Sequence, residues 1–450
     1  MNRVQARQGT SDFRASQRSV RRRPSQSAVP ARWPAPLRYV LVFLLLVVIG
    51  RVHEAVPGLG SLPVATPAVV LTAIGLVWFG FTRRIPTIMR APQLRLVLLL
   101  LMVGLISVPF SLWPGGALAG VQTFARLCVV CCLLTLAVVN TEQLGTLTRV
   151  FAVAAAILVT GQILQSFGGM AGFTRQQSLS FDRNEVAMYC VMAIPFALGW
   201  AMSGKRLIGF GLAAYLAVGV VATNSRGGFL ALAVLGVVFL VRSPMLSRMK
   251  KLVLVAGAVG LAGVAGSEEY WDRIGSIARP ADDYNFQDRE GRVEIWKRGL
   301  GYAAANPITG VGFGNFPIAE GGTLEDEGYG VKWSTAHSSY VLVAAELGIP
   351  GLLVFVALVL SIWREARRAA RLTQRGRGPP EAIDSRRLAL LGEATSLSLV
   401  AYLLASVFLS AAYSAGFLFL VSVGASVGIL RRRATKGRLT VTRSRVPASA

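Results

Sequence analysis

The chain is long, apolar and strongly basic. Its 450 residues are 53% hydrophobic and only 15% charged, with a mean hydropathy of +0.55 and a net charge of +25. This balance excludes an ordinary soluble protein and predicts a protein that crosses a membrane many times. The basic residues lie between apolar stretches rather than in one patch. They therefore indicate membrane orientation, and no nucleic-acid partner is expected.

In chain order, a polar tail comes first and a series of apolar stretches follows. The tail, residues 1–36, is rich in Arg, Ser, Gln and Pro, and we expect it to be disordered, cytoplasmic and in contact with membrane lipids. Some apolar stretches are shorter than the roughly 20 residues that cross about 30 Å of hydrocarbon. Together they predict an all-α polytopic membrane protein of about twelve spans, near 37–50, 63–81, 94–112, 121–139, 147–166, 185–202, 207–223, 227–241, 251–265, 338–362, 393–410 and 413–430.

Charge sets the predicted orientation. With the N-terminus in the cytoplasm, 35 of the 47 Lys and Arg residues fall on the cytoplasmic side, as the positive-inside rule expects. Both termini are then cytoplasmic. The expected organisation is spans 1–9 over 37–265, one large extracytoplasmic loop over 266–336 between spans 9 and 10, spans 10–12 over 337–430 with a basic cytoplasmic loop at 363–392, and a basic cytoplasmic tail at 431–450.

The large loop contains two patterned stretches. In residues 288–305, apolar side chains recur at 293, 296, 300 and 303, which predicts an amphipathic helix on the membrane surface, ended by Asn306-Pro307. The glycine-rich stretch Gly310–Phe316 neither follows a strand nor opens a helix. It therefore predicts a tight turn rather than a nucleotide-binding loop.

Polar residues of three kinds are predicted to meet at the outer face. His337 opens span ten, where an imidazole can titrate, bind phosphate or act as a base near neutral pH. Arg226 lies in a very short outer turn, and Arg292 and Arg298 lie on the predicted loop helix. Because a guanidinium stays charged and grips phosphate at two points, these arginines suit a lipid-linked diphosphate. The structural alternatives are an interfacial Arg226, a solvated helix face for the other two arginines, and a helix-capping His337.

These stretches resemble the O-antigen ligase family. His337-Ser338, nine residues, Gly348, two residues and Gly351 is similar to the His-[Asn/Ser/Gln]-x9-Gly-x2-[Gly/Thr/Tyr] signature of that family. The family includes ligases, polysaccharide polymerases and protein O-oligosaccharyltransferases, so the resemblance indicates the chemistry better than the acceptor. Further similarities are Ser225-Arg226-Gly227-Gly228 at the start of a span, and Gly291-Arg292, Trp296, Asn306-Pro307 and Gly310–Phe316 in the loop.

The resemblance implies an inverting glycosyltransferase of the bacterial cytoplasmic membrane, with its site facing outward. The donor would be a glycan on polyprenyl (undecaprenyl) diphosphate, and the acceptor a sugar hydroxyl of lipid A-core or of a growing glycan. Arg226 and Arg292 would stabilise the leaving diphosphate. His337 would deprotonate the acceptor or, as a cation, hold a phosphate oxygen. The further substrate-binding candidates are Arg298, Arg183, Ser338 and Glu346.

Glu346 is the one acid inside the apolar run that follows His337. An ionisable residue within a span is costly and is a functional candidate for that reason. Nine residues from His337, it would lie on the opposite face of a straight helix. We therefore expect structural ion pairing for Glu346 rather than catalysis.

No metal or other cofactor is expected. Hard divalent ions need rigidly held oxygen ligands, and the short outer turns offer only Glu54, Asp182 and Glu185. Three of the four cysteines, at 128, 131 and 132, share one face of a predicted span, where packing explains them better than metal binding.

Other function classes remain open from sequence. A polysaccharide repeat-unit polymerase of the same superfamily would use the same donor. A lipid-linked oligosaccharide transporter would be expected to place ionisable residues along several spans. Apart from Arg126 and Glu346 the predicted spans are nearly free of charge, which favours an enzyme at one face over a transporter, a receptor or a structural protein.

Overall fold

The chain folds into helices. The computed structural model describes residues 30, 32–54, 62–166, 182–242, 249, 275, 288–328, 333–372 and 381–444, and no strand occurs within them, which confirms the all-α class. The helices are α2 (Ala35–Val48), α3 (Ala65–Trp78), η1 (Phe81–Arg84), α4 (Ile85–Ile88), α5 (Pro92–Ser107), η2 (Val108–Phe110), α6 (Pro114–Ala137), α7 (Thr141–Ser166), α8 (Arg183–Met202), α9 (Arg206–Ala222), α10 (Arg226–Arg242), α14 (Arg292–Ala305), α15 (Phe316–Asp326), α16 (Ser339–Ala370), α17 (Glu381–Ala405) and α18 (Ala415–Ser444).

Seven of the described helices are long and apolar enough to cross a membrane: α5 with η2, α6, α7, α8, α16, α17 and α18. The chain bends by 85° between α3 and the η1–α4 pair, which would together make an eighth span. Gly80 in that break has φ +74°, a conformation that favours glycine. The apolar helices α2, α9 and α10 are shorter, and the predicted span 251–265 lies outside the described residues. A multi-pass protein is therefore shown, whereas the count of twelve spans stays a prediction.

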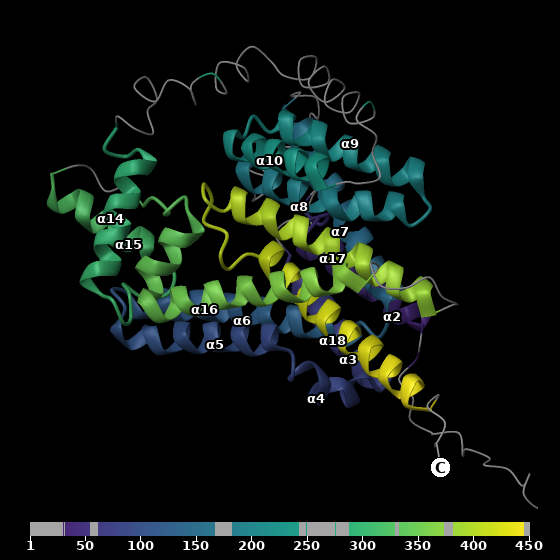
Figure 1. Ribbon diagram of the computed structural model, residues 1–450. Helices are drawn as coiled ribbons and strands as arrows, with labels where there is room; N and C mark the ends of the chain where they lie inside the picture. The colour runs from purple at the N-terminus through teal and green to yellow at the C-terminus, as the bar shows by residue number, and fades with distance from the viewer. Residues whose placement is uncertain are drawn as a thin grey trace, which may run out of the picture.

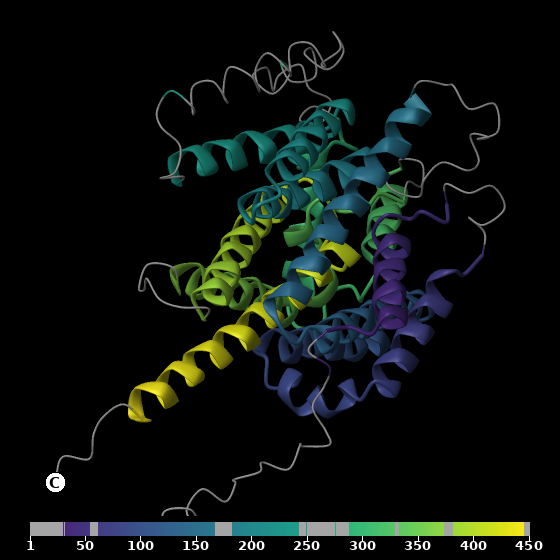
Figure 2. The same ribbon diagram turned by 90° about the vertical axis from the view of Figure 1, so that its right-hand side faces the viewer.

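Helix α16 lies at the centre of the arrangement (Figure 1). It packs against α5, α17 and α18 along its length and against α14 and α15 near its N-terminal end. Helix α17 also packs against α8, which in turn packs against α7 and α9. Figures 1 and 2 both show α18 extending beyond the other helices at its C-terminal end. The α14–α15 pair and the basic C-terminal half of α18 thus lie at different ends of the molecule.

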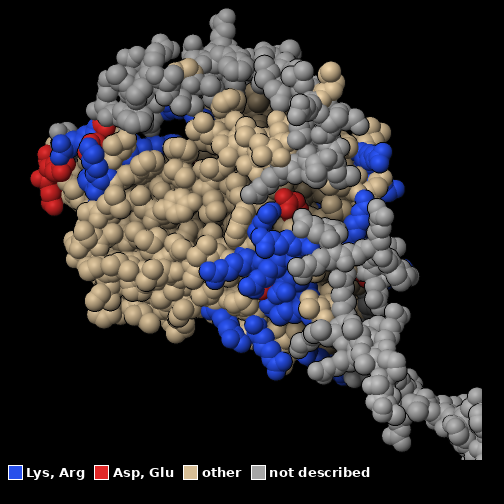
Figure 3. All heavy atoms as spheres, in the orientation of Figure 1, with Lys and Arg blue, Asp and Glu red and all other residues tan. Residues whose placement is uncertain are grey.

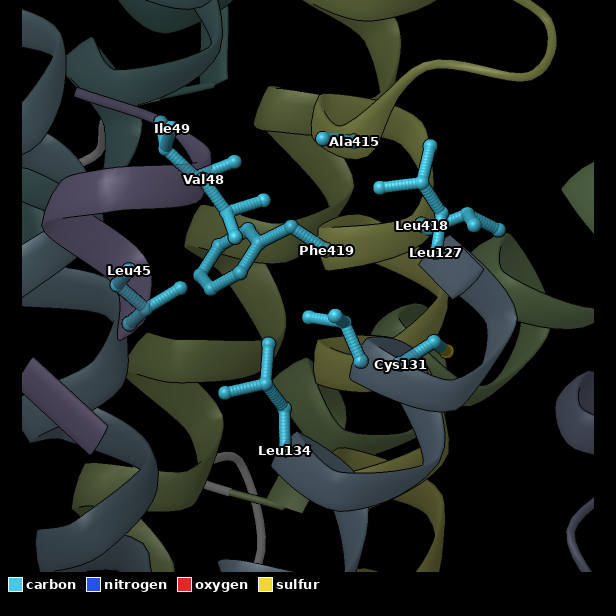
Figure 4. A pocket seen from close by; sticks show the side chains of 10 residues that line it. Leu45, Val48, Ile49, Leu127, Cys131, Leu134, Ala415, Leu418 and Phe419 are labelled. Atoms are coloured by element: carbon cyan, nitrogen blue, oxygen red, sulfur yellow. The ribbon is translucent and has the colours of Figure 1, made fainter. Parts of the chain in front are cut away.

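Aromatic rings and small apolar side chains fill the interior. Phe151 of α7 stacks on Phe419 of α18 with ring centroids 4.3 Å apart, which joins two helices distant in sequence. The small cavity beside Phe419, about 10 Å³ in volume, is lined by apolar residues of α2, α6 and α18 (Figure 4). Cys131 lies among them, and no group of three or more His, Cys, Asp or Glu that could hold a metal occurs in the described part of the chain. The packing role expected for the cysteines agrees with these surroundings.

Basic side chains gather where α16 and α18 end. Figure 3 shows many Lys and Arg residues together on this side, next to a broad face almost without charge. Within this region, Glu365 is buried and paired with Arg431 at 2.9 Å and Arg432 at 3.2 Å. Helices α16, α17 and α18 continue into the expected basic loop and tail. Much of 363–392 and 431–444 is therefore helical, because Lys and Arg favour helices and can extend their charges toward water.

Candidate functional site

His337 lies in the turn that precedes α16, in a strained conformation. Its φ is +48°, in the left-handed region, which costs a non-glycine residue about 1–3 kcal/mol. The residues on both sides of it are fixed. The Trp296 indole donates a hydrogen bond to the carbonyl of Ala336 at 3.0 Å, and the amide of Ser339 donates to the carbonyl of Ser406 at 2.9 Å. Strain of this kind persists only where the surrounding structure enforces it, and it is often found at functional sites.

The nine residues between α17 and α18, the 406–414 segment, form the other wall of this turn. The Ser339 hydroxyl donates to the carbonyl of Leu409 at 2.6 Å and accepts from the amide of Ala411 at 2.9 Å. The Thr335 hydroxyl donates to that of Ser410 at 2.8 Å. The sequence did not predict this segment, because its apolar residues read as the end of one span and the start of the next.

Arg226 is the first residue of α10 and follows a fixed turn. Asn224 has φ +54°, and the Ser225 hydroxyl accepts a hydrogen bond from the amide of Gly228 at 3.1 Å, which caps the helix start. The same hydroxyl donates to the Asn184 side chain at 2.7 Å. The N-terminal ends of α8 and α10 are therefore joined, and with them the positions of Arg183 and Arg226.

Phe408 of the 406–414 segment connects the Arg226 turn to the loop helix α14. A Cβ added at Gly227 would lie 3.2 Å from the Phe408 ring, so only a glycine allows this approach without movement. The rings of Phe408 and Trp296 have centroids 6.3 Å apart. Trp296 follows Arg292 by four residues and so shares its face of α14. The elements that carry Arg226, Arg292 and His337 thus converge on one segment.

Arg298 serves a different purpose in this structure. Its Nε donates to both carboxylate oxygens of Glu320 at 3.1 Å, and its terminal nitrogen pairs with the same group, which ties α14 to α15. Burial lowers the pKa of Arg298, but the hydrogen bond and charge of Glu320 outweigh it, and the pKa is raised overall. Tyr302 also donates to Glu320, at 3.2 Å. These contacts occupy the guanidinium for which the sequence predicted substrate binding.

The face of α14 that is buried within the protein differs from the apolar stripe that was expected to lie on the membrane surface. Helix α14 ends at Ala305, as the Asn306-Pro307 pair predicted. Its buried residues are Ile295 and Gly299, whereas Leu300 of the predicted apolar stripe is 57% exposed. A Cβ at Gly299 would lie 2.5 Å from Val341, so the absent side chain sets the close approach of α14 to α16. Sequence periodicity missed this face because glycine carries no hydrophobic signal.

The glycine-rich stretch is a tight turn, as predicted, but it leads directly into α15 at Phe316, so the expectation that it opens no helix was wrong. Gly310, Gly312 and Gly314 have φ values of +63°, +101° and +72°, which side chains would resist. The amides of Val311 and Gly312 donate to the carbonyls of Ala345 and Glu346 in α16, at 2.8 and 3.1 Å. The turn therefore takes hydrogen bonds that would otherwise continue α16.

Helix α16 breaks at this point. Gly348 has φ +63° and ψ −162°, and the amide of Ile349 donates to the carbonyl of Pro307 at 2.8 Å instead of continuing the helix. Pro350 has no N–H to offer to the helix. A Cβ at Gly348 would lie 2.5 Å from the Pro307 carbonyl oxygen. Gly348, the first glycine of the signature that begins at His337, is therefore needed because the backbone of Pro307 lies against α16 at this position.

Glu346 does not form the ion pair expected from sequence. The residue is 2% exposed, and among the described residues its carboxyl group contacts no cation. Its Oε1 accepts a hydrogen bond from the backbone amide of Phe316, the first residue of α15, at 3.2 Å. The N-terminus of α15 provides the positive potential that was expected from a cationic side chain. Helix capping therefore replaces ion pairing.

The remaining predicted residues fall at helix starts. Ser338 is buried at the N-cap of α16, and its carbonyl accepts from the amide of Leu342 at 2.9 Å. Of the acids considered for metal binding, Glu54 pairs with Arg51 at 2.8 Å, and Asp182 accepts from the Asn184 side chain at 2.8 Å. Their oxygens are directed at protein partners in this structure.

Comparison with known proteins identifies the region that holds these elements. A family model described as O-antigen ligase matches residues 211–356, from α9 to α16. No curated protein matches the chain. The matched region includes Arg226, Arg292, the glycine turn, His337 and the break at Gly348. Residues 211–356 of this chain are therefore similar to the O-antigen ligase family.

Proposed function

We propose that the protein transfers a glycan from a polyprenyl diphosphate to a sugar hydroxyl at the outer face of the cytoplasmic membrane. One observation supports this most: the elements that bear Arg226, Arg292 and His337, all within the family match, converge on the 406–414 segment that follows it in the chain. Glycan transfer from a lipid diphosphate needs cations for the leaving group and a base or proton donor beside them. Residues of these two types lie on the elements that meet there.

The arginines are placed where an anion is favoured. Arg183, Arg226 and Arg292 are the first residues of α8, α10 and α14. The first turn of a helix presents unpaired backbone N–H groups and the positive end of its dipole. A guanidinium at that position adds a full charge and a two-point grip on phosphate oxygens. The diphosphate is the part of the donor that this arrangement suits.

The reaction requires one bond to form and one to break at the anomeric carbon. The acceptor oxygen attacks from the face opposite the diphosphate, the anomeric carbon–oxygen bond breaks, and the configuration inverts. Negative charge then grows on the leaving phosphate oxygen, where Arg226 and Arg292 stabilise it. His337 takes the acceptor proton, or as a cation holds a phosphate oxygen. A ligase and a polymerase share these steps and differ in the acceptor.

The test is a transfer assay with purified protein in lipid nanodiscs, a lipid-diphosphate-linked glycan and sugar acceptors. Arg226→Ala, Arg292→Ala and His337→Ala should each lower turnover by about 100-fold or more, the usual loss for one preorganised transition-state donor. Arg226→Lys should fall between Ala and wild type, because an ammonium lacks the planar two-point grip.

Lys297→Ala is the matched control, since Lys297 lies on α14 with its side chain 66% exposed. It should keep wild-type turnover. Wild-type turnover in all three alanine variants would refute the site. In a deletion strain, accumulation of long unattached polymer would identify a ligase, and accumulation of single repeat units a polymerase.

A further inference from the structure

The carboxyl group of Glu346 lies inside the protein at the point where α16 breaks. It is 2% exposed and has no cation beside it among the described residues. Buried carboxyl groups are rare unless hydrogen bonds or charges compensate them. The proposed reaction steps do not use Glu346, so its place in the interior needs another explanation.

Three polar groups from two other parts of the chain face this carboxyl group. Its Oε1 accepts from the amide of Phe316 at 3.2 Å, and the amide of Gly314 also faces the carboxyl group. The Tyr413 hydroxyl faces it from the 406–414 segment. Tyr413 Oη and Glu346 Oε2 are both buried and lack a partner in good hydrogen-bond geometry, although buried polar atoms are usually paired.

The contacts hold the part of α16 that lies before its break. The first part of α16, from Ser339 to Leu347, follows the His337 turn and carries Glu346 near its end. Gly348 interrupts the helical hydrogen bonds that would otherwise fix this part to the rest of α16. The orientation of this first part of α16 therefore depends on its contacts with three neighbouring elements: the glycine turn, α15 and the 406–414 segment.

We propose that Glu346 is a positioning residue for the transfer reaction, whose carboxyl group clamps the glycine turn to the first part of α16 and, through Tyr413, to the 406–414 segment that holds the His337 turn. This inference rests on the proposed function. Loss of the clamp lets the first part of α16 turn about Gly348 and moves His337 relative to Arg226. Catalysis depends on sub-ångström placement, whereas binding through the arginines on other helices does not need Glu346.

Glu346→Ala should lower kcat by about 10- to 100-fold, the loss expected for a misplacement on the order of 1 Å, with KM changed less than about threefold. Glu346→Gln keeps an acceptor oxygen for the Phe316 amide and should restore most of kcat. Tyr413→Phe should give a smaller loss than Glu346→Ala. Glu325→Ala is the control, because Glu325 is an exposed residue of α15.

Hydrogen exchange provides a second measurement that does not depend on the reaction. The amides of Val311, Gly312 and Phe316 should exchange at least about tenfold faster in Glu346→Ala than in the wild type, and Glu346→Gln should restore protection. If Glu346→Ala does not fold, the exchange of the same amides is compared among Glu346→Gln, Tyr413→Phe and the wild type instead.

Two results would overturn the proposal: unchanged exchange of these amides in Glu346→Ala, or wild-type kcat in that variant. Equal loss of kcat in the glutamine and alanine variants with normal exchange would also overturn it, since it would assign the carboxylate a charge role in the chemistry. If the wild-type protein transferred no glycan at all, the proposed function would fail while the exchange experiment still tested the clamp.

Discussion

At the scale of single residues, the backbone of His337 matters as much as its ring. His337 has a left-handed backbone conformation. Hydrogen bonds from the Trp296 indole and the Ser339 amide hold the turn in which it lies. The sequence predicted the residue and its place before a helix. It could not predict the conformation, because the strain is stabilised by the 406–414 segment, about 70 residues away in the chain.

Two substitutions separate the contribution of the His337 ring to catalysis from the contribution of its backbone conformation to stability. His337→Asn should keep the fold, since asparagine tolerates positive φ, but should lose about 100-fold or more in turnover because it cannot exchange a proton near neutral pH. His337→Val should lower the unfolding free energy by about 1–3 kcal/mol, since a β-branched side chain resists that conformation. Turnover and thermal unfolding in detergent measure the two effects. Equal stability of both variants would contradict the strain at this position.

At the scale of elements, sequence patterns predicted the pieces of the site but not how they join. The end of α14 and the tight turn at 310–316 followed from proline and glycine. The break in α16 did not, although Gly348 was visible. That break depends on carbonyls of α16 accepting amides from the glycine turn, a contact that no local pattern records. The roles of Gly299 and the 406–414 segment were not predicted, because both depend on contacts with residues distant in sequence, which a hydrophobicity pattern does not show.

Two glycines of positive φ form a matched pair for testing the break. Gly348→Ala adds a Cβ 2.5 Å from the Pro307 carbonyl oxygen, whereas Gly314→Ala, at a similar φ, meets no atom within 4 Å. Both should lose about 1–3 kcal/mol of stability because a side chain resists positive φ, and Gly348→Ala should lose more and also lower turnover, since its ψ of −162° lies in a region adopted essentially by glycine alone. Unfolding midpoints of the two variants provide the comparison. Identical losses would show that the close approach to Pro307 carries no energy.

At the scale of the whole molecule, orientation in the membrane is the main prediction still to be tested. Charge patterning places the α14–α15 pair outside and the start of α17 inside. A cysteine at Asp326 should react with a membrane-impermeant maleimide in spheroplasts, while one at Arg386 should react only after the membrane is opened. Both positions are exposed on the protein. The reverse pattern would put the proposed site on the wrong side for its donor.

A second prediction for the whole molecule is that glycan transfer needs no metal ion. It follows from the proposal that arginine side chains neutralise the diphosphate. If Arg226 and Arg292 do so, purified protein should keep its turnover in excess EDTA and lose it gradually as salt screens the arginine–phosphate contacts. Turnover measured with EDTA, with added Mg²⁺ and over a salt series tests this. Activity abolished by EDTA and restored by Mg²⁺ would move attention to Glu54, Asp182 and Glu185.

The 406–414 segment also has a consequence for how the protein is made. The segment lies between α17 and α18, and it holds residues that were synthesised more than 60 positions earlier, such as Thr335. A ribosome that has finished the whole family-matched region has therefore not yet produced the part that holds His337 in place. The proposed active site is incomplete until residues 406–414 have been synthesised, so a chain shortened before residue 406 would insert most of the helices that precede it and remain catalytically silent.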